Sequence, residues 1–366
     1  MQKVLVMAVL VLFLGCDDRV PPSSSEEPVF SNVKPDEHVV FFRTSGWLDT
    51  TRHEWHLPIH GWIYEPEDSS SRKAAFETAL EKQFGLVADK KTAPNLARRL
   101  NLLIADNERD KGIVIQIAGR NYELPPSADN GHIKTTIAIP LADVEEYSSN
   151  GFIDYVAVTR APESREFKGM VRLVEPSGRS VISDIDDTVK ITDVTERRSM
   201  LNHTFLLDFV AAPGMAQLYG DWATDGVSFH FVSSSPWQLY SPLSEFLDDN
   251  GFPWATFNLK AIRFRDETIF DLFKKGTETK PAIIEQILVM YPGRQFVLVG
   301  DSGEQDPEVY AGLLRKHPEQ VLKVYIRNVT AETADNARFT AVFDDIDAAR
   351  WQLFEDPQSL TLPLGW

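Results

Sequence analysis

The sequence of 366 residues contains a single cysteine, Cys16, so no disulfide can form within the chain. Basic residues are also few: 37 lysines and arginines stand against 54 acidic residues, and the formal net charge is −17. Nucleic-acid binding depends on lysine and arginine contacts to the phosphate backbone, so this balance argues against a nucleic-acid partner. Anionic membrane surfaces should repel the chain too, unless a local basic patch or an anchor intervenes.

The apolar run at the N-terminus is short and extends only from Val4 to Leu14. It cannot span a bilayer as a helix, but it fits the core of a signal peptide. The segment 13–16, Phe-Leu-Gly-Cys, resembles the lipobox of bacterial lipoproteins. That resemblance implies cleavage before Cys16 and a thioether-linked diacylglycerol on it; the alternative is an ordinary signal anchor with an incidental cysteine. We expect a lipoprotein anchored to a membrane of the bacterial cell envelope, on its periplasmic or extracytoplasmic face.

Changes in composition divide the chain into four predicted segments. These are a signal peptide (1–15), a disordered tether (16–37), a β-rich domain (38–178) and an α/β domain (179–366). The tether is rich in proline, serine and acidic residues, which cannot form a core. It would let the domains that follow move over a membrane surface.

Residues 38–178 contain several short stretches with the pattern of strands. The candidate strands are the apolar run 39–42, the stretch in which Trp55, Leu57, Ile59 and Ile63 share one parity, and residues 112–117 and 133–139. Helical spacing of apolar residues appears between Ala75 and Phe84 and again between Leu96 and Leu103. The pattern predicts a β-rich, sandwich-like domain with a helical excursion.

Three histidines in this region, His53, His56 and His60, suggest a metal site at first sight. Pro58 argues against a helix that would gather them, and on a strand His53 falls on the opposite face from the other two. We therefore expect a surface or packing role for these histidines.

From residue 179 onward, short apolar runs alternate with helical patterns, which predicts β-α units around a parallel sheet. The runs lie at 181–182, 229–232, 296–299 and 321–326. Polar or acidic residues directly follow the first three runs, at 183–188, 233–235 and 300–306. Since ligands of open α/β sheets bind outside the carboxyl ends of the strands, this edge is predicted to hold a functional site.

The acidic residues at this edge predict a metal-dependent reaction. Asp184 and Asp186 would share a face if they lay on a strand, where their charges would repel each other unless a cation lay between them. Asp301 and Asp306 add carboxylates after a neighbouring strand. Oxygen ligands without histidine or thiolate favour Mg²⁺, and a carboxylate beside a metal can attack phosphorus.

Lys280 is the candidate cation of the site. Pro281 fits the first position of a helix whose apolar face includes Ile283, Ile284, Ile287 and Leu288. A lysine at the positive end of a helix is mildly unfavourable, and a bound phosphate would reverse the sign. The alternative is a solvated lysine that tolerates this small cost.

These residues resemble the motifs of the haloacid dehalogenase superfamily of phosphatases. Residues 184–188, Asp-Ile-Asp-Asp-Thr, match its D-x-D-x-T signature, and Ser233 matches the second motif. Lys280, which lies 21 residues before Asp301, matches the third, and Asp301 with Asp306 matches the acidic fourth. The resemblance implies a Rossmann-like parallel sheet for residues 179–366.

A narrower resemblance is to the actin-patch-associated phosphatidate phosphatases, which belong to the lipin-like branch of that superfamily. It rests on the strings at 183–190, 235–240, 300–308 and 325–328, and covers roughly residues 178–330. Ser234 departs from the asparagine of the fungal pattern, which puts fine specificity in question. The β-rich region before it also fits the family's layout, and the resemblance implies a phosphorylated lipid as substrate.

The resemblance implies a role for each site residue. Asp184 would attack phosphorus to form an aspartyl-phosphate, and Asp186 would protonate the leaving oxygen and then activate water. Thr188 would orient the loop around Asp186, while Ser233 and Lys280 would hold the phosphoryl oxygens. The Mg²⁺ ligands would be Asp184, the backbone carbonyl of Asp186, and Asp301, with Asp306 in support.

Two further features stay open at the level of sequence. Residues 258–265 alternate basic and apolar side chains, so they could form a hairpin that attracts an anionic headgroup or simply a solvated hairpin face. Trp237 and Trp254 could contact acyl chains, but core packing is favoured. The sequence thus predicts a phosphatidate phosphatase, with a phosphatase of another phosphomonoester as the alternative and a non-catalytic binding domain disfavoured by the intact acids.

Overall fold

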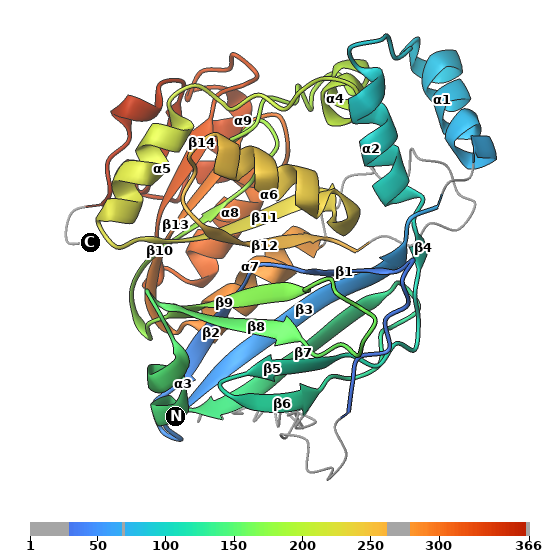
Figure 1. Cartoon of the computed structure of the whole chain (residues 1–366). Helices are drawn as coiled ribbons and strands as arrows, with labels where there is room; N and C mark the ends of the chain where they lie inside the picture. The colour runs from blue at the N-terminus through green and yellow to red at the C-terminus, as the bar shows by residue number, and fades with distance from the viewer. Residues whose placement is uncertain (1–28, 68–69, 262–278, 364–366) are drawn as a thin grey trace, which may run out of the picture.

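The computed structural model describes residues 29–67, 70–261 and 279–363. The predicted signal peptide, Cys16 and the first part of the predicted tether lie outside these ranges. Figure 1 shows the β-rich region and the α/β region side by side, with helices gathered mainly around the second. Within the described ranges, no helix has the length and apolar character needed to cross a membrane.

Residues 29–37 are attached to the β-rich domain, so the predicted tether is too long at its C-terminal end. The Ser31 N–H donates to the Val158 carbonyl at 2.7 Å, and its hydroxyl donates to the Val114 carbonyl at 3.0 Å. Glu37 is fully buried and forms an ion pair with Lys111. These bonds satisfy backbone and charged groups that would otherwise be buried without partners, which composition alone does not reveal.

The β-rich domain is one hydrogen-bonded sheet, in the order β1-β3-β2-β9-β8-β5-β6, with β4 and β7 also paired to β3. Among the described strands of this sheet, β2 and β9 are parallel and the other pairs are antiparallel. The strands are β1 (His38–Phe41), β2 (Thr44–Asp49), β3 (Glu54–Glu65), β4 (Asp106–Asn107), β5 (Val114–Ile117), β6 (Arg120–Glu123), β7 (His132–Pro140), β8 (Phe152–Ala157) and β9 (Lys168–Val174).

The core of this domain lies between the two ends of the sheet. Ile59 of β3 and Ile137 of β7 belong to the same buried cluster as Ile115 of β5 and Ile153 of β8. The sheet therefore folds over on itself, and the predicted sandwich-like packing is achieved by one continuous sheet. The predicted strands and their alternating burial are confirmed, as in the pattern of β7.

The predicted helical excursion consists of α1 (Ser70–Phe84) and α2 (Ala93–Leu103), between β3 and β4; α3 (Leu141–Tyr147) follows β7. Leu80, Leu96 and Leu100 of the excursion pack against Leu201 and Phe205 of α4 (Arg197–Phe205), which belongs to the α/β domain. Figure 1 shows α1, α2 and α4 grouped together above one side of the molecule.

The second sheet is parallel throughout, in the order β12-β11-β10-β13-β14-β15. Its strands are β10 (Ser177–Ser183), β11 (Ser228–Pro236), β12 (Ala255–Lys260), β13 (Gly293–Asp301), β14 (Val321–Arg327) and β15 (Trp351–Phe354). The predicted α/β class with a Rossmann-like parallel sheet is confirmed. The boundary between the two domains falls between β9 and β10, a few residues before the predicted position.

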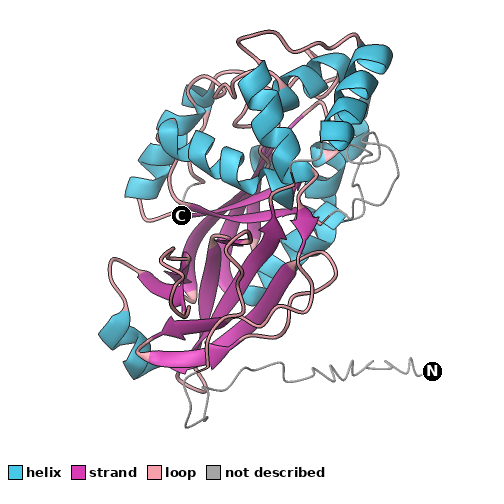
Figure 2. Cartoon of the chain, turned by 45° about the vertical axis from the view of Figure 1, so that its right-hand side comes forward, coloured by secondary structure: helices cyan, strands magenta, loops and turns pink. Residues whose placement is uncertain are grey.

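Helices cover both faces of this sheet, as Figure 2 shows. Val181 of β10 faces a core that includes α5 (Met215–Thr224) and α6 (Tyr240–Asp249), while the next residue, Ile182, faces α7 (Thr279–Met290), α8 (Asp306–Lys316) and α9 (Ala337–Phe343). Short 3₁₀ helices complete the described chain: η1 (Trp237–Leu239), η3 (Ala348–Arg350) and η4 (Pro357–Ser359). Burial on both faces explains why the strands read as continuous apolar runs.

Three local predictions require correction. Residues 258–260 belong to β12, a parallel edge strand, so the predicted hairpin is wrong there; residues 262–265 lie outside the described residues. Described α7 begins at Thr279, so Pro281 is its third residue. Asp184 and Asp186 follow the end of β10 and lie in a loop, so the predicted shared face of a strand does not apply.

The histidines of β3 have the predicted packing role. His56 stacks on Trp47 with ring centroids 5.1 Å apart. His60 is buried, and its Nε2 lies 3.0 Å from Nδ1 of His132. His53 is exposed in the turn before the strand, so the three do not converge on a metal.

Candidate active site

The candidate site lies at the carboxyl ends of β10, β11 and β13, the edge that the sequence pattern predicts. Asp184 directly follows β10 and is 1% exposed. Its N–H donates to the Val299 carbonyl of β13 at 2.9 Å, which fixes the start of the loop on the neighbouring strand. The Thr188 hydroxyl donates to Asp184 Oδ2 at 3.4 Å.

Lys280 is buried against Asp184, and the alternative of a solvated lysine is ruled out. Its Nζ lies 2.9 Å from Asp184 Oδ1 and also forms an ion pair with Asp306. Burial lowers the pKa of Lys280, but the carboxylates of Asp184 and Asp306 outweigh it and hold the pKa well above its usual value. The ammonium is therefore a fixed positive charge beside the candidate nucleophile.

Asp306 supports the site and does not reach the carboxylate cluster itself. It is the first residue of α8; its Oδ1 accepts from Lys280, and its Oδ2 accepts from the Asp301 N–H at 3.2 Å. Gly300 makes room for it, because a Cβ at that position would collide with the Asp306 carboxylate.

Asp184, Asp301 and Glu304 place one carboxylate oxygen each within 4.8 Å of one another. Asp301 Oδ1 accepts from the N–H groups of Gly303 and Glu304, at 2.6 and 3.1 Å. Its Oδ2 is buried and has no hydrogen-bond partner among the described residues. An orphaned carboxylate oxygen next to two other acids fits a hard divalent cation, which prefers such ligands.

The pKa shifts of the clustered acids also favour a bound cation. Burial raises the pKa of Asp184 well above its usual value, and although Lys280 opposes this, Asp306, Glu304 and Asp186 add to it. Burial likewise raises the pKa of Asp301, again with help from the neighbouring acids. Positive charge beyond that of Lys280 is needed to keep these acids ionised together.

Asp186 is turned away from this cluster toward the end of β11. Its Oδ2 accepts from the hydroxyls of Ser233 at 3.3 Å and Ser235 at 2.9 Å. Its Oδ1 lies 2.7 Å from Lys190 Nζ and accepts from the Thr192 hydroxyl at 2.8 Å. Burial raises the pKa of Asp186, but Lys190 and these hydroxyl donors outweigh it, and the net pKa is lowered.

The structure thus brings most of the predicted residues together, with one exchange of roles. Thr188, expected to orient the loop around Asp186, bonds to Asp184 instead, and Thr192 bonds to Asp186. The side chain of Asp186 is not among the clustered carboxylates. Ser233 reaches Asp186 and also accepts from the Ser235 N–H at 3.0 Å.

Sequence reasoning missed Glu304, Lys190, Ser235 and Asp187 as site residues. All four lie in the matched strings but at positions to which no role was attached. Asp187 has a left-handed backbone, with φ of 56°. Its carboxylate accepts from the N–H groups of Thr192, Asp193 and Val194 at 2.6 to 2.8 Å, which offsets that strain and fixes the loop around Asp186.

The two tryptophans have the packing role that was favoured. Trp237 is buried and packs on Phe42, with ring centroids 4.3 Å apart. Trp254 packs against Phe152 at 5.0 Å and lies under the Arg43 guanidinium. Both side chains therefore join the two domains.

Comparison with known proteins agrees with this geometry. The family described as "Phosphatidate phosphatase APP1, catalytic domain" matches residues 179–328, which contain every site residue named above. Residues 179–328 belong to this family of catalytic domains. Phosphatidate phosphatase APP1 of Saccharomyces cerevisiae is 34% identical over 176 residues, which are 44% of this chain and 28% of that protein. An uncharacterised protein of Schizosaccharomyces pombe is 30% identical over 171 residues, which are 46% of this chain and 28% of that protein.

The chain therefore spans less than a third of the length of these two curated relatives. Among solved structures, D,D-heptose 1,7-bisphosphate phosphatase of B. bronchiseptica, complexed with magnesium and phosphate, aligns with 49% of this chain and 93% of its own, at 13% identity and a TM-score of 0.29. A putative β-phosphoglucomutase of Thermotoga maritima aligns with 49% of this chain and 95% of its own, at 13% identity and a TM-score of 0.29. At these scores the likeness carries no argument about function.

Proposed function

We propose that this chain is a Mg²⁺-dependent phosphatidate phosphatase, which releases diacylglycerol and phosphate through an aspartyl-phosphate on Asp184. The observation that carries the proposal is the contact between Lys280 and Asp184, buried beside an orphaned oxygen of Asp301. Membership of residues 179–328 in the catalytic-domain family supports phosphatidate as the substrate.

In the first step a carboxylate oxygen of Asp184 forms a bond to phosphorus, and the bond from phosphorus to the ester oxygen breaks. Lys280 is placed to neutralise charge on the phosphoryl oxygens, since phosphoryl transfer depends mainly on positioning and electrostatics. Asp186 gives a proton to the leaving alkoxide, and the negative phosphoryl group bound beside it would favour the protonated form that this step needs. Ser233 and Ser235 hold that carboxyl group in place at the end of β11.

In the second step Asp186, now a carboxylate, takes a proton from water, and the water oxygen attacks phosphorus. The acyl-phosphate bond breaks, phosphate leaves, and the carboxylate of Asp184 is restored. The lowered pKa of Asp186, with Lys190 and the hydroxyls outweighing burial, keeps the group ionised and so able to accept this proton. General acid–base catalysis of this kind contributes about 10²- to 10⁴-fold.

Asp184, Asp301 and Glu304 would hold the Mg²⁺, with Asp306 in support through Lys280 and the Asp301 backbone. When bound, the metal would offset the clustered negative charge and act as a Lewis acid toward the phosphoryl group. Glu304 takes a place in this set that the sequence did not assign.

A phosphate-release assay tests the proposal. The wild type and Asp184→Asn are compared with Mg²⁺ and with EDTA, over phosphatidate, a sugar phosphate and a nucleoside monophosphate. We expect phosphatidate to be the best substrate, and folded Asp184→Asn to be inactive on all of them. Full release by that variant would contradict the nucleophile, while preference for a soluble phosphomonoester would leave the chemistry standing and reject the lipid substrate.

We also propose that the protein is a lipoprotein of the bacterial cell envelope, held to a membrane through Cys16. The support is the lipobox-like segment 13–16 and the acidity of a chain with a net charge of −17, which has no general electrostatic attraction to anionic lipid. A lipid anchor contributes about 0.8 kcal/mol per buried methylene. Mass spectrometry of the N-terminus tests it, and an unmodified Cys16 or a chain still starting at Met1 would reject it.

A further inference from the structure

A cavity lies at the opposite end of the parallel sheet from the candidate active site. It has a volume of about 220 Å³ and lies between the two domains. Ser228 and His230, near the start of β11, line it on one side, and Ser45 and Arg172 of the β-rich domain line it on the other. Ser233, near the end of β11, belongs to the candidate active site, so residues of one strand contribute to both the cavity and that site.

Two side chains that line this cavity have buried polar atoms without partners among the described residues. One is Nε2 of His230, a residue that is 1% exposed, and the other is Nε1 of Trp254. The indole nitrogen is always a donor. His230 Nδ1 lies 2.9 Å from the Thr256 hydroxyl, and if it accepts that proton, Nε2 is a donor too. Buried donors of this kind need an acceptor.

The charge around the cavity is positive. Its lining residues include Arg172 and no aspartate or glutamate. Arg172 donates to the Asn150 carbonyl at 3.3 Å and lies over the ring of Phe152, and burial lowers its pKa.

A second guanidinium, that of Arg294, lies behind the cavity wall that includes Ser228. It is 4% exposed and bonds to the carbonyls of Glu175, Ser177 and Arg179 and to the hydroxyls of Ser180 and Ser228. Burial lowers its pKa to about 10, Tyr291 and Glu175 oppose this lowering, and Arg172 adds to it. Arg172 thus lines the cavity, and Arg294 lies behind it in contact with the lining residue Ser228. The lining residues include no carboxylate, in a protein with a net charge of −17.

We propose that this cavity binds a small inorganic oxyanion, such as phosphate or sulfate, at the interface of the two domains. The guanidinium of Arg172 and the N–H of Trp254 would donate to it from opposite domains, and His230 would complete the set. The volume of the cavity exceeds that of one such ion with a hydration water or two. Because both domains supply donors, occupancy should stabilise their contact as well as the fold.

Inorganic phosphate is the probe, titrated into the full chain by calorimetry and by thermal unfolding, with EDTA present and ionic strength held constant. Arg172→Gln removes the charge, and Trp254→Phe removes only the N–H while keeping a ring against Phe152. We expect each change to weaken phosphate binding in this cavity about tenfold or more. Each should also abolish the increase in Tm that phosphate bound there produces. Phosphate bound at the catalytic site would remain in every variant.

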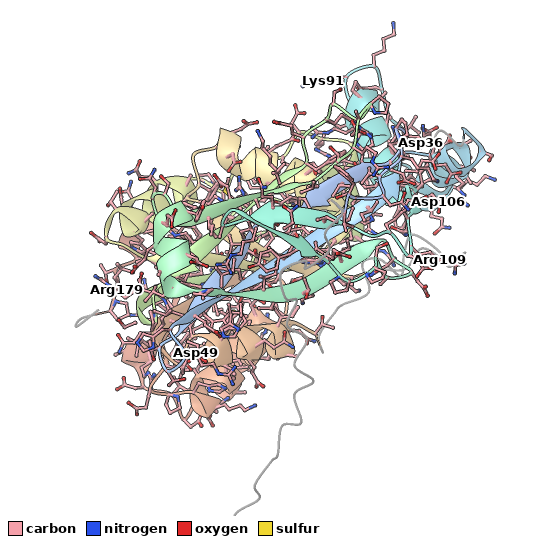
Figure 3. All side chains as sticks on the ribbon, turned by 60° about the horizontal axis from the view of Figure 1, so that its bottom comes forward. Asp36, Asp49, Lys91, Asp106, Arg109 and Arg179 are labelled. Carbon is pink, nitrogen blue, oxygen red and sulfur yellow. The ribbon has the colours of Figure 1, made fainter. Side chains whose placement is uncertain are left out.

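The control is Arg109→Gln. Arg109 is exposed and lies at the opposite end of the molecule from Arg179, whose carbonyl accepts from Arg294 (Figure 3). This variant should bind phosphate as the wild type does. Equal phosphate affinities and Tm increases for wild type, Arg172→Gln and folded Trp254→Phe would overturn the proposal. Selenate soaked into crystals gives an independent check, since anomalous density is expected between Arg172 and Trp254 and water alone would contradict the site.

Discussion

Lys190 Nζ lies 2.7 Å from Asp186 Oδ1, and the lysine side chain is only 2% exposed. The two residues are brought together by the turn after β10, in which the N–H of Lys190 donates to the Ile185 carbonyl at 3.0 Å. A buried ammonium beside a carboxylate favours one orientation and the ionised form of that group. In the proposed reaction, Lys190 would therefore hold Asp186 ready for the basic step.

Lys190→Met should slow turnover by roughly tenfold or more, within the range that a positioned acid or base contributes. With the ammonium gone, burial is less opposed and the pKa of Asp186 rises, so the acid side of the kcat profile should move to higher pH. Lys316→Met, which breaks an exposed pair with Glu285, is the matched control. An unchanged kcat and pH profile in Lys190→Met would show that the contact has no catalytic role.

Asp301→Asn and Glu304→Gln should raise the Mg²⁺ concentration needed for half-maximal activity by about tenfold or more, with much of the rate restored at high Mg²⁺. The reason is that both carboxylates lie within reach of one cation with Asp184. Phosphate release against Mg²⁺ concentration measures this. Glu308→Gln, near the same loop but paired with Arg338, should leave the curve unchanged. If Glu304→Gln behaves like Glu308→Gln, Glu304 is not a ligand.

The elements that carry the site could be predicted because their signals are local. Apolar runs that end in Asp184, Ser233 and Asp301 mark strands and their carboxyl ends, and parallel strands bring those ends to one edge. The contacts that orient the side chains could not be predicted in the same way. Thr188 and Thr192 are both near Asp186 in sequence, and only the turn geometry decides which hydroxyl bonds to it.

Contacts between distant segments also could not be predicted from the sequence. Residues 258–260 have the alternation of a half-exposed strand, and the pattern is the same whether the partner strand is parallel or antiparallel. The packing of α2 on α4 has no specific sequence signal, since each helix shows only an apolar face. The interdomain cavity has no sequence signature at all.

Gly300→Ala should lower activity strongly while leaving most of the fold intact. A Cβ there would meet the carboxylate of Asp306, which holds both Lys280 and the Asp301 backbone. We expect a fall in kcat of roughly 10- to 100-fold, as for a displacement of about 1 Å at an active site. Gly312→Ala, on α8 with open space around its Cβ position, is the control and should be neutral or stabilising. Wild-type kcat in Gly300→Ala would contradict the role of Asp306.

Stability should fall as the pH drops from about 6.5 to about 4, through the pair of the buried His60 and the partly buried His132. Burial lowers the pKa of His132 to about 4, and burial with the neighbouring His132 lowers that of His60 well below the usual value. The unfolded chain therefore binds more protons in this window, so the neutral pair contributes stability above pH 6.5 that is lost on acidification. The double variant His60→Phe, His132→Phe should show a flatter dependence of Tm on pH. Equal slopes for both proteins would contradict the assignment.

Arg99 of α2 connects the helical excursion to the surroundings of Lys190 and Asp186. It is 5% exposed, and it donates to the carbonyls of Thr204 and Leu207 at 3.2 and 2.7 Å. Its guanidinium also stacks on Phe209 at 3.9 Å, and the same ring lies 4.9 Å from Nζ of Lys190. A chain of contacts therefore runs from the β-rich domain through Phe209 to the lysine that holds Asp186.

Arg99→Met should lower both stability and kcat, and the two effects have separate causes. Stability should fall by about 1–3 kcal/mol, because buried carbonyls lose a charged donor. The fall in kcat should be smaller than for Lys190→Met and should not add to it in the double variant, since Arg99 acts through Lys190. Arg98→Met is the control: Arg98 is the preceding residue on α2, its ion pair with Glu245 is half-exposed, and such pairs contribute little. Additive losses in kcat, measured with saturating Mg²⁺, would show that Arg99 only stabilises the fold.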